Sequence, residues 1–211
     1  EADWYNELLN QEGSYQKEVI LPNLLRLAAV KKGEHILELG CGTGFFSRAL
    51  AEAGAQVVGV DISRELITKA EAVRQPRVTY HVGSADAIPF VSSASMDGVV
   101  MVLALQNIEN AQGVIKECSR VLKPSGRMFI ILNHPAFRIP GSSSWGWDEK
   151  NIVQYRRIDK YLSEMKAPIQ MHPGADPKSI TWSFHRPLQF YCKLFAKNGF
   201  GVVRLEEWSS H

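Results

Sequence analysis

The sequence holds little cysteine, no long apolar run and almost no excess charge of either sign. Its three cysteines form no CxxC pair, so a disulfide framework or a zinc site is not expected and a reducing, cytoplasmic setting fits. No apolar stretch approaches the length of a membrane span, and no signal peptide is visible. With 24 basic and 22 acidic residues, the net charge of +2 gives no electrostatic reason to expect nucleic acid as a partner.

What is present is typical of one globular domain. Of the 211 residues, 45% are apolar and 22% charged, which are ordinary values for a chain long enough to bury its own core. Internal repeats and low-complexity tracts are absent from the sequence. The histidines are scattered and no acid pair accompanies them, so no metal is expected.

The most informative stretch is ILELGCGTGFFS, residues 36–47. A short apolar run ending at Leu39 predicts a buried strand, and apolar residues at helical spacing from Phe45 to Ala53 predict a helix. Between them stand three alternating glycines, Gly40, Gly42 and Gly44. Glycine lets a ligand approach the backbone closely, and a helix N-terminus presents unpaired N–H groups. The stretch therefore predicts strand, turn and helix, with a ligand at the turn.

The spacing around the glycines decides between ligand classes. A phosphate loop requires a lysine after its glycines, and the third glycine of a dinucleotide fingerprint falls on Phe45. Glu38, at the end of the strand, would repel a pyrophosphate but suits a ligand that carries positive charge. The alternatives are a tight turn that binds nothing and, more distantly, a site for NAD-linked hydride transfer.

The string ELGCGTG resembles motif I of the class I S-adenosylmethionine-dependent methyltransferases, and RVLKPSGRMFI resembles the segment leading into that family's fifth strand. The resemblance covers residues 34–133 well and 185–208 loosely. It implies S-adenosylmethionine as cofactor and S-adenosylhomocysteine as product, without phosphate and with the positive charge that suits Glu38. It also implies an α/β fold, a Rossmann-like and mostly parallel sheet with an antiparallel edge and helices on both faces.

Alternation of strand and helix signals supports this fold class. The predicted organisation is a helical cap over 1–30, a cofactor-binding core over 34–133, a substrate lid inserted after the fifth strand over 134–184, and a helix and strand over 185–208. Further strands are predicted over 56–60, 77–82, 97–105 and 127–132. Asn110 is expected to cap the helix between the last two strands. We expect the strand order to reverse after the first strand, which opens a crevice at the carboxyl ends of the strands.

Two acids extend the predicted cofactor site. Asp61 lies about 20 residues beyond the glycine turn, where a ribose-binding carboxylate is expected, and Ser63 is the better helix cap. The resemblance assigns Asp86 to the adenine amine and the next backbone N–H to a ring nitrogen; the alternative for Asp86 is a turn aspartate. Ile62, Ile88 and Phe90 are expected to sandwich the ring. The predicted cofactor-binding residues are Tyr15, Glu38, Gly40, Cys41, Gly42, Thr43, Gly44, Phe45, Asp61, Ile62, Asp86, Ala87, Met101 and Leu103. Tyr15 follows from N-terminal helices closing over the cofactor in this family, and its alternative is an ordinary surface residue.

Residues 134–184 are rich in aromatics and too long for a simple turn, which favours a lid over a small-molecule pocket. The alternative is that its aromatics pack a satellite core. Segments 153–161 and 179–184 are expected to pair as strands over the site. The predicted substrate-binding residues are Gln106, Phe137, Arg138, Trp145, Tyr155 and Trp182, with Gln106 at a position where family members often carry histidine.

The predicted function is transfer of a methyl group from S-adenosylmethionine to a small-molecule acceptor through oxygen, nitrogen or carbon. A general base is needed only for a protonated acceptor, and His134 and His185 are the candidates because histidine titrates near neutral pH. Either histidine has an ordinary structural role as its alternative. An RNA or tRNA methyltransferase and a non-catalytic S-adenosylmethionine-binding protein stay open as rivals. We expect a monomer or homodimer.

Overall fold

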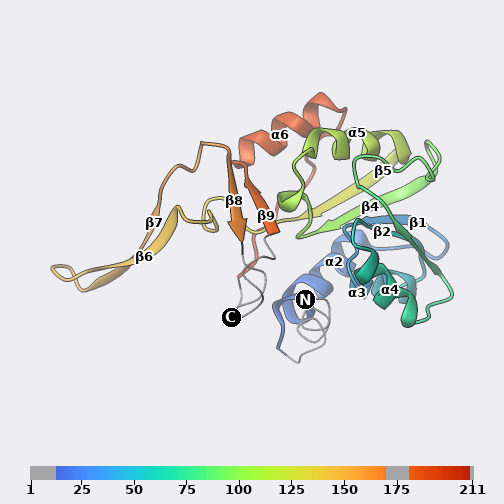
Figure 1. The fold of residues 1–211 in the computed structure, drawn as a ribbon, viewed down its shortest axis with the longest axis horizontal. Coiled ribbons are helices and arrows are strands. Elements are labelled where there is room, and N and C mark those ends of the chain that lie inside the picture. The colour runs from blue at the N-terminus through green and yellow to red at the C-terminus, as the bar shows by residue number, and fades with distance from the viewer. Residues whose placement is uncertain (1–12, 170–180, 210–211) are drawn as a thin grey trace.

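The computed structural model describes residues 13–169 and 181–209 (Figure 1). Its centre is a five-stranded sheet in the order β3-β2-β1-β4-β5, with every pair parallel. The strands are β1 (His35–Leu39), β2 (Gln56–Asp61), β3 (Val78–Val82), β4 (Met96–Val102) and β5 (Leu122–Ile131). This confirms the predicted α/β class and the reversal of strand order beside β1. The order reverses between β1 and β4, so the predicted crevice corresponds to the carboxyl ends of these two strands.

Helices cover both faces of the sheet, so β4 is buried on both sides. Val99 and Met101 pack into the core under α5 (Ala111–Val121) and α6 (Leu188–Lys197). Val100 and Val102 pack into the core under α2 (Leu21–Ala28) and α3 (Phe45–Glu52). This two-sided burial explains why β4 is the most apolar run of the sequence. Among the described residues, no helix combines the length and apolarity needed to cross a membrane.

The predicted helix caps are confirmed. Ser63 accepts a hydrogen bond from Leu66 N at the start of α4 (Arg64–Ala72), and Asn110 accepts one from Gly113 N at the start of α5. At the N-terminal end, a π-helical turn (Gln16–Ile20) continues into α2, which buries an i, i+4 stripe. The first twelve residues of the predicted helical cap lie outside the described residues.

The insert after β5 forms two antiparallel pairs. Strand β6 (Ser143–Asp148) pairs with β7 (Val153–Ile158), and β8 (Met165–Ile169) pairs with β9 (Thr181–His185). The expected pairing of 153–161 with 179–184 is therefore wrong. Each segment takes the partner closer in sequence, which closes the shorter loop at lower entropic cost. Figure 1 shows the β6–β7 ribbon projecting away from the five-stranded sheet.

The C-terminal segment differs from the expectation of an edge strand. Residues 200–208 carry no strand, so the antiparallel strands of the described residues all lie in the two small sheets of the insert. Side chains hold this segment instead: Arg26 pairs with Glu206, and Tyr15 Oη donates to Trp208 O at 3.4 Å. Two other boundaries also shift. β4 ends at Val102 because Leu103 takes a φ of 53°, and α6 begins after Pro187 rather than at His185.

Candidate cofactor site

The glycines of the turn between β1 and α3 are required by their backbone dihedral angles and by the side chains packed against them. Gly40 and Gly44 have φ of 74° and 76°, which L-residues rarely adopt. A Cβ at Gly40 would lie 2.5 Å from Ala104 Cβ, and one at Gly44 would lie 2.1 Å from Tyr80 Oη. These glycines are therefore required before any ligand is considered. Cys41 and Phe45 turn inward, since Cys41 is buried and Phe45 meets Phe46 edge-on at 5.0 Å.

Asp61 joins the glycine turn to the end of β2. Its Oδ2 accepts from Gly42 N at 2.9 Å and its Oδ1 from Ser63 N at 2.9 Å. Each carboxylate oxygen keeps a second acceptor position, so the pair of ribose hydroxyls expected from the sequence remains chemically possible here. The helix cap is Ser63, so Asp61 is not needed for that role.

Glu38 is buried behind the turn, with 1% of its surface exposed. Burial raises the pKa of its carboxyl to about 8; the hydrogen bond from Ser47 Oγ opposes this, and the nearby Asp61 adds to it. In these surroundings Glu38 is thus largely a neutral acid at pH 7, which differs from the charged carboxylate expected from the sequence. A cation bound nearby would favour its ionised form.

Two buried side-chain atoms of the described residues lack a hydrogen-bond partner: Thr43 Oγ1 and Asn107 Oδ1. Thr43 lies in the glycine turn after β1 and Asn107 in the turn after β4, so both stand at the carboxyl edge of the sheet. Buried polar atoms without partners are rare because each costs free energy. A ligand with hydrogen-bonding groups would satisfy them, and the acids around the turn suit a cationic nucleoside. The residues present therefore fit S-adenosylmethionine.

The polar groups of the loop after β3 already have hydrogen-bond partners in the protein. Ser84 Oγ and Asn110 Nδ2 donate to the two oxygens of Asp86, and these hydrogen bonds hold the pKa of that carboxyl below its usual value. The N–H of Ala87, assigned by the resemblance to an adenine ring nitrogen, donates to Ser84 O at 3.0 Å. This geometry matches the turn-aspartate alternative. Adenine contacts through Asp86 and Ala87 are thus limited to the carboxylate's remaining acceptor positions unless the loop rearranges.

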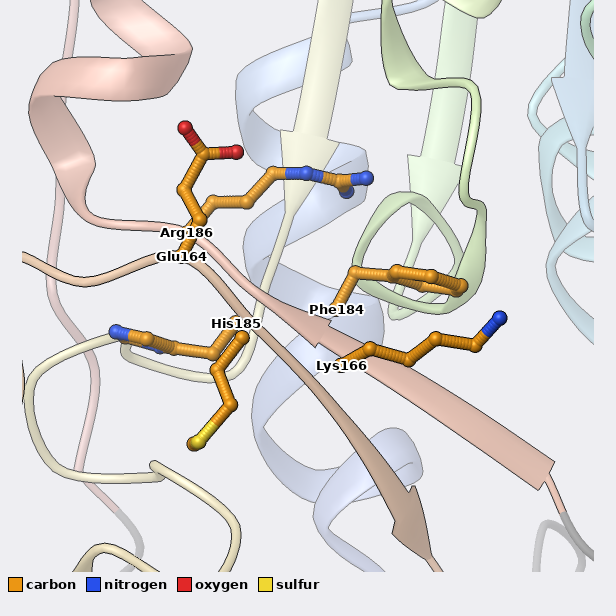
Figure 2. Close-up of a pocket in the computed structure, with 6 residues that line it drawn as sticks. Glu164, Lys166, Phe184, His185 and Arg186 are labelled. Atoms are coloured by element: carbon orange, nitrogen blue, oxygen red, sulfur yellow. The ribbon is translucent and has the colours of Figure 1, made fainter.

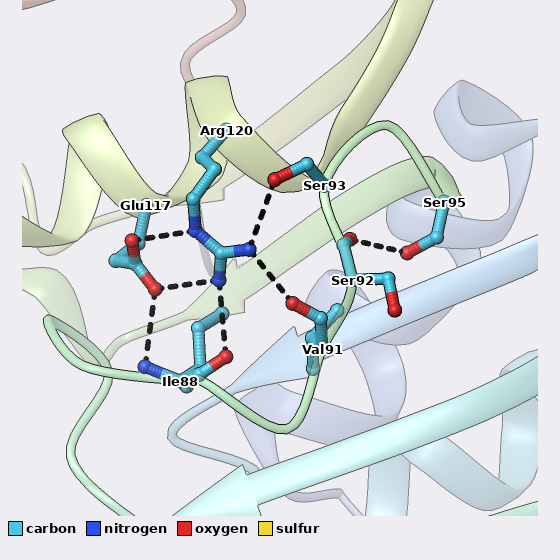
Figure 3. Close-up of polar contacts among 7 residues, drawn as sticks. All are labelled: Ile88, Val91, Ser92, Ser93, Ser95, Glu117 and Arg120. Carbon is cyan, nitrogen blue, oxygen red and sulfur yellow. Dashed lines mark hydrogen bonds and ion pairs between the residues drawn. The ribbon is translucent and has the colours of Figure 1, made fainter.

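Figure 3 shows what fixes the segment that follows Asp86. Ile88 N donates to Glu117 Oε2 at 3.1 Å, and Arg120 donates to Ile88 O at 3.0 Å and to Val91 O at 2.8 Å. The side chain of Ile88 is fully buried, so the expectation that it helps to sandwich the adenine ring is wrong. Ile62 and Phe90 stay accessible, 76% and 44% exposed.

The turn after β4 is held from outside the sheet by Arg186. This residue is only 6% exposed, and its guanidinium stacks on Phe184 and Phe190 and donates to three backbone carbonyls. The acceptors are Leu105 O, Ile108 O and Glu109 O, at 3.5, 3.0 and 2.7 Å. Gln106 in the same turn accepts from Asn133 N at 3.3 Å. Of the other predicted residues here, Met101 has a fully buried side chain, so only its backbone can line a site.

The β8–β9 pair lies beside this turn. Figure 2 shows Lys166 and Phe184 pointing to one side of the pair and His185 to the other. Lys166 pairs with Glu109 at 3.4 Å and lies 4.9 Å from the ring centre of Trp182. A cavity of about 200 Å³ adjoins the pair. Among the predicted substrate residues of the insert, Trp182 is thus linked to the end of this turn through Lys166 and Glu109.

The other predicted substrate residues of the insert lie at exposed positions. Trp145 and Tyr155 lie on the projecting β6–β7 ribbon, 65% and 48% exposed. Phe137 and Arg138 lie in the loop after β5, both exposed to solvent, and Phe137 packs against His134 at 4.7 Å.

Both candidate bases have ring nitrogens in structural hydrogen bonds. His134 Nδ1 accepts from Ala136 N at 3.1 Å, and its Nε2 pairs with Glu207. His185 is buried, and its Nε2 meets Tyr161 O at 2.9 Å, where a carbonyl can only accept. These contacts agree with the structural alternative for both residues, and His134 has no free lone pair to take a proton.

Sequence reasoning missed four residues that build the site: Ser47, Asn107, Arg120 and Arg186. Arg120 stands in the RVLKPSGRMFI string that resembles the family, which marks it as structural without revealing what it binds. The sequence carries no signal for Ser47 and Arg186, because their partners lie in other elements. It carries none for Asn107 either, because whether Oδ1 finds a partner depends on all of its neighbours in space.

Comparison with known proteins agrees with this geometry. Residues 37–130 match the family model described as a methyltransferase domain. The chain is 36% identical to demethylmenaquinone methyltransferase of Tropheryma whipplei over 52% of this chain and 46% of that protein. It is 30% identical to ubiquinone biosynthesis O-methyltransferase of Idiomarina loihiensis over 61% of this chain and 56% of that protein. The chain thus spans about half the length of the curated relatives it matches.

A solved structure extends the likeness to nearly the whole chain. The S-adenosylmethionine-dependent methyltransferase of Mesorhizobium loti superposes with a TM-score of 0.77 at 26% identity, covering 92% of this chain and 87% of that one. Residues 37–130 thus match a methyltransferase domain, and this match, the glycine motif and the fold likeness together support a class I S-adenosylmethionine-dependent methyltransferase.

Proposed function

We propose that this protein transfers the methyl group of S-adenosylmethionine to a small-molecule acceptor. The observation that carries the proposal is the carboxyl edge of β1 and β2, where Asp61 braces the glycine turn beside the unpaired Thr43 Oγ1. The acids at this edge favour a cationic nucleoside over a phosphate-bearing one. A non-catalytic cofactor-binding protein is the alternative, because these residues explain binding and not turnover.

When bound, S-adenosylmethionine would supply an electrophilic methyl group: the acceptor's lone pair bonds to the methyl carbon in line as the carbon–sulfur bond breaks, and S-adenosylhomocysteine leaves. The chain's contribution is to bind, orient and exclude water. In the proposal, Asp61 accepts the ribose hydroxyls, and backbone at residues 40–44 and 101–103 lines the rest. Glu38 acts through its charge, since it ionises when a cation sits nearby. In the proposal, the edge of the nucleoside site is lined by four other predicted residues: Tyr15, Ile62, Asp86 and Ala87.

The names of the curated relatives favour a quinol or hydroxylated aromatic ring as acceptor. In the proposal, residues 134–184 form the acceptor side of the domain, residues 34–133 the cofactor side and residues 1–30 a helical cap. Gln106 and Trp182 are the predicted substrate residues best situated for contact. His134 is not retained as a base, because both of its ring nitrogens form structural hydrogen bonds. His185 is not retained because it is buried and its Nε2 donates to Tyr161 O. An acceptor that ionises by itself, such as an acidic phenol, would need no base.

The remaining expectations concern surroundings and partners. We propose that the protein is a cytoplasmic monomer or homodimer. We also propose that it does not use nucleic acid as substrate, because the net charge of the chain is near neutral. Binding to a tRNA mixture is expected to be weak and independent of salt, whereas a phosphate-reading enzyme would lose affinity steeply as salt rises.

The test joins binding to turnover. Calorimetry should show uptake of S-adenosylhomocysteine and none of NADH; the reverse result would sink the proposal. A panel of catechols, hydroxybenzoates and short-chain prenylated quinols is then incubated with S-adenosylmethionine, and S-adenosylhomocysteine is quantified by mass spectrometry. Formation with at least one acceptor, lost in Asp61→Ala, supports transfer. Tight cofactor binding with no product from any acceptor would favour the binding protein.

A further inference from the structure

The C-terminal segment, residues 204–208, is joined to the rest of the protein by side chains rather than by secondary structure. It carries no helix or strand, and three of its five residues are exposed. Its contacts nevertheless reach residues far away in sequence: Tyr15 and Trp208 are 193 positions apart, and Arg26 and Glu206 are 180. A segment with such contacts fixes the elements that it joins relative to one another.

One set of contacts reaches the described part of the helical cap, residues 13–30. Arg26 donates to both carboxylate oxygens of Glu206, and Trp208 Nε1 donates to the same carboxylate at 3.0 Å. Tyr15 Oη donates to Trp208 O at 3.4 Å. The segment thus meets this part of the cap near its beginning and again near the end of α2.

A second contact reaches the loop after β5. His134 follows the end of that strand, so it lies at the carboxyl edge of the sheet. Its Nδ1 accepts from Ala136 N at 3.1 Å, which leaves the proton on Nε2, and Nε2 faces Glu207. A neutral imidazole can therefore donate to Glu207. The segment joins the cap to the end of β5 whether or not this histidine is charged.

The helix of the cap runs opposite to the strands of the sheet. Ala28 O, at the end of α2, accepts from Arg127 at 2.7 Å, and Arg127 lies beside Gly98 near the start of β4. The end of α2 is thus at the amino edge, and Tyr15 lies toward the carboxyl edge, where the glycine turn is. α2 also shares an apolar cluster with α3, the helix that follows this turn.

We propose that residues 204–208 form a C-terminal clasp that holds the helical cap beside the cofactor site and slows release of the cofactor. Glu206 and Glu207 are its positioning residues, and they act through Arg26 and His134. The side chains of Arg26 and Glu206 are 49% and 23% exposed, and ion pairs this exposed are weak. The clasp can therefore open while the sheet stays folded. The inference rests on the proposed function, which puts Tyr15 at the edge of the nucleoside site.

The test measures the dissociation rate of S-adenosylhomocysteine by surface plasmon resonance on the immobilised protein. Arg26→Gln, Glu206→Gln and Glu207→Gln should each raise this rate about two- to fivefold. The double variant Arg26→Gln/Glu206→Gln should be no faster than the faster of its two single variants, because the side chains act as a pair. The matched control is Lys17→Gln, an exposed cation of the cap outside these contacts, which should match the wild type.

Two further measurements separate the clasp from a general loss of stability. In Glu206→Gln, the amides of 16–28 should exchange hydrogen faster, whereas those of 98–102 in β4 should keep the wild-type rate. The wild-type protein gives the other measurement. S-adenosylhomocysteine carries no net charge, so its dissociation rate should rise between about 20 mM and about 500 mM salt only through screening of the ion pairs in the clasp.

Each outcome decides. Wild-type dissociation rates in all three single variants, or hydrogen exchange that accelerates equally in β4, overturn the clasp while leaving the proposed function in place. A double variant in which the two single effects multiply overturns the pairing of Arg26 with Glu206 as the clasp's contact to the cap. Failure of the wild-type protein to bind S-adenosylhomocysteine overturns the proposed function itself, and the role of the clasp with it.

Discussion

Gly42 and Asp61 are 19 residues apart in sequence, yet the backbone N–H of one donates to the carboxylate of the other at 2.9 Å. The bond links the turn after β1 to the end of β2, and the same carboxylate accepts from Ser63 N. Asp61 thus shapes the ligand loop and also stands ready to bind the ligand. Its two roles can be separated by experiment.

Asp61→Asn should lower both stability and affinity. An amide keeps one oxygen and turns its NH2 toward the second backbone N–H, so one buried donor loses its acceptor. We expect the free energy of unfolding to fall by about 1–3 kcal/mol and the Kd of S-adenosylhomocysteine to rise at least about tenfold. Urea denaturation and calorimetry measure the two effects. Glu71→Gln, on the exposed side of α4, is the control; matching behaviour of the two variants would contradict the dual role.

Glu38 predicts a pH dependence of stability. Its pKa is about 8 in the folded protein against an ordinary value of 4.5, so the folded state holds the proton more tightly than the unfolded state. The resulting stabilisation is complete below pH 4.5 and is lost as pH rises through 8, with a slope on the order of 1 kcal/mol per pH unit. Urea denaturation at pH 5.5, 6.5, 7.5 and 8.5 should show this decline in the wild type and a flatter profile in Glu38→Gln. Parallel profiles would show that Glu38 does not titrate in this range.

Gly44→Ala should destabilise the protein by strain and by collision. Its φ of 76° costs a β-carbon about 1 kcal/mol, and Tyr80 Oη would lie 2.1 Å away. Gly33→Ala separates the two causes, because Gly33 has a φ of 87° and no atom within 4 Å of an added Cβ. We expect Gly44→Ala to lose at least about 1 kcal/mol more than Gly33→Ala in thermal or urea unfolding. Adding Tyr80→Phe to the Gly44→Ala variant should recover only part of this additional loss of stability, since the ring carbon Cζ would still lie 2.6 Å from the added Cβ.

Arg186→Met should loosen the turn after β4. Three backbone carbonyls lose their donor, and the free energy of unfolding should fall by about 2–3 kcal/mol. Hydrogen exchange of the amides of 105–109 should accelerate. Lys166→Met is the control, because its ion pair with Glu109 is exposed and is worth less than about 1 kcal/mol. Exchange that accelerates equally in the two variants would mean that Arg186 is not what holds the turn.

The sequence by itself determined the part of the fold that local signals encode. Apolar runs marked the parallel strands, three alternating glycines marked the turn after β1, and Ser63 and Asn110 marked two helix starts. Each of these signals works within a few residues, through backbone freedom, side-chain period or a cap. Because parallel strands end at one edge, the sequence pattern alone was enough to predict Glu38, Gly40 and Asp61 together there.

Only the tertiary structure decided what distant residues do to one another. It paired β6 with β7 and β8 with β9, and it left 200–208 without a strand. In the folded protein both ring nitrogens of His134 form hydrogen bonds. Burial raises the pKa of Glu38 to about 8, and this burial comes from the surrounding elements. The tertiary structure also left Asn107 Oδ1 unpaired, which depends on every neighbour in space and on no pattern in the chain.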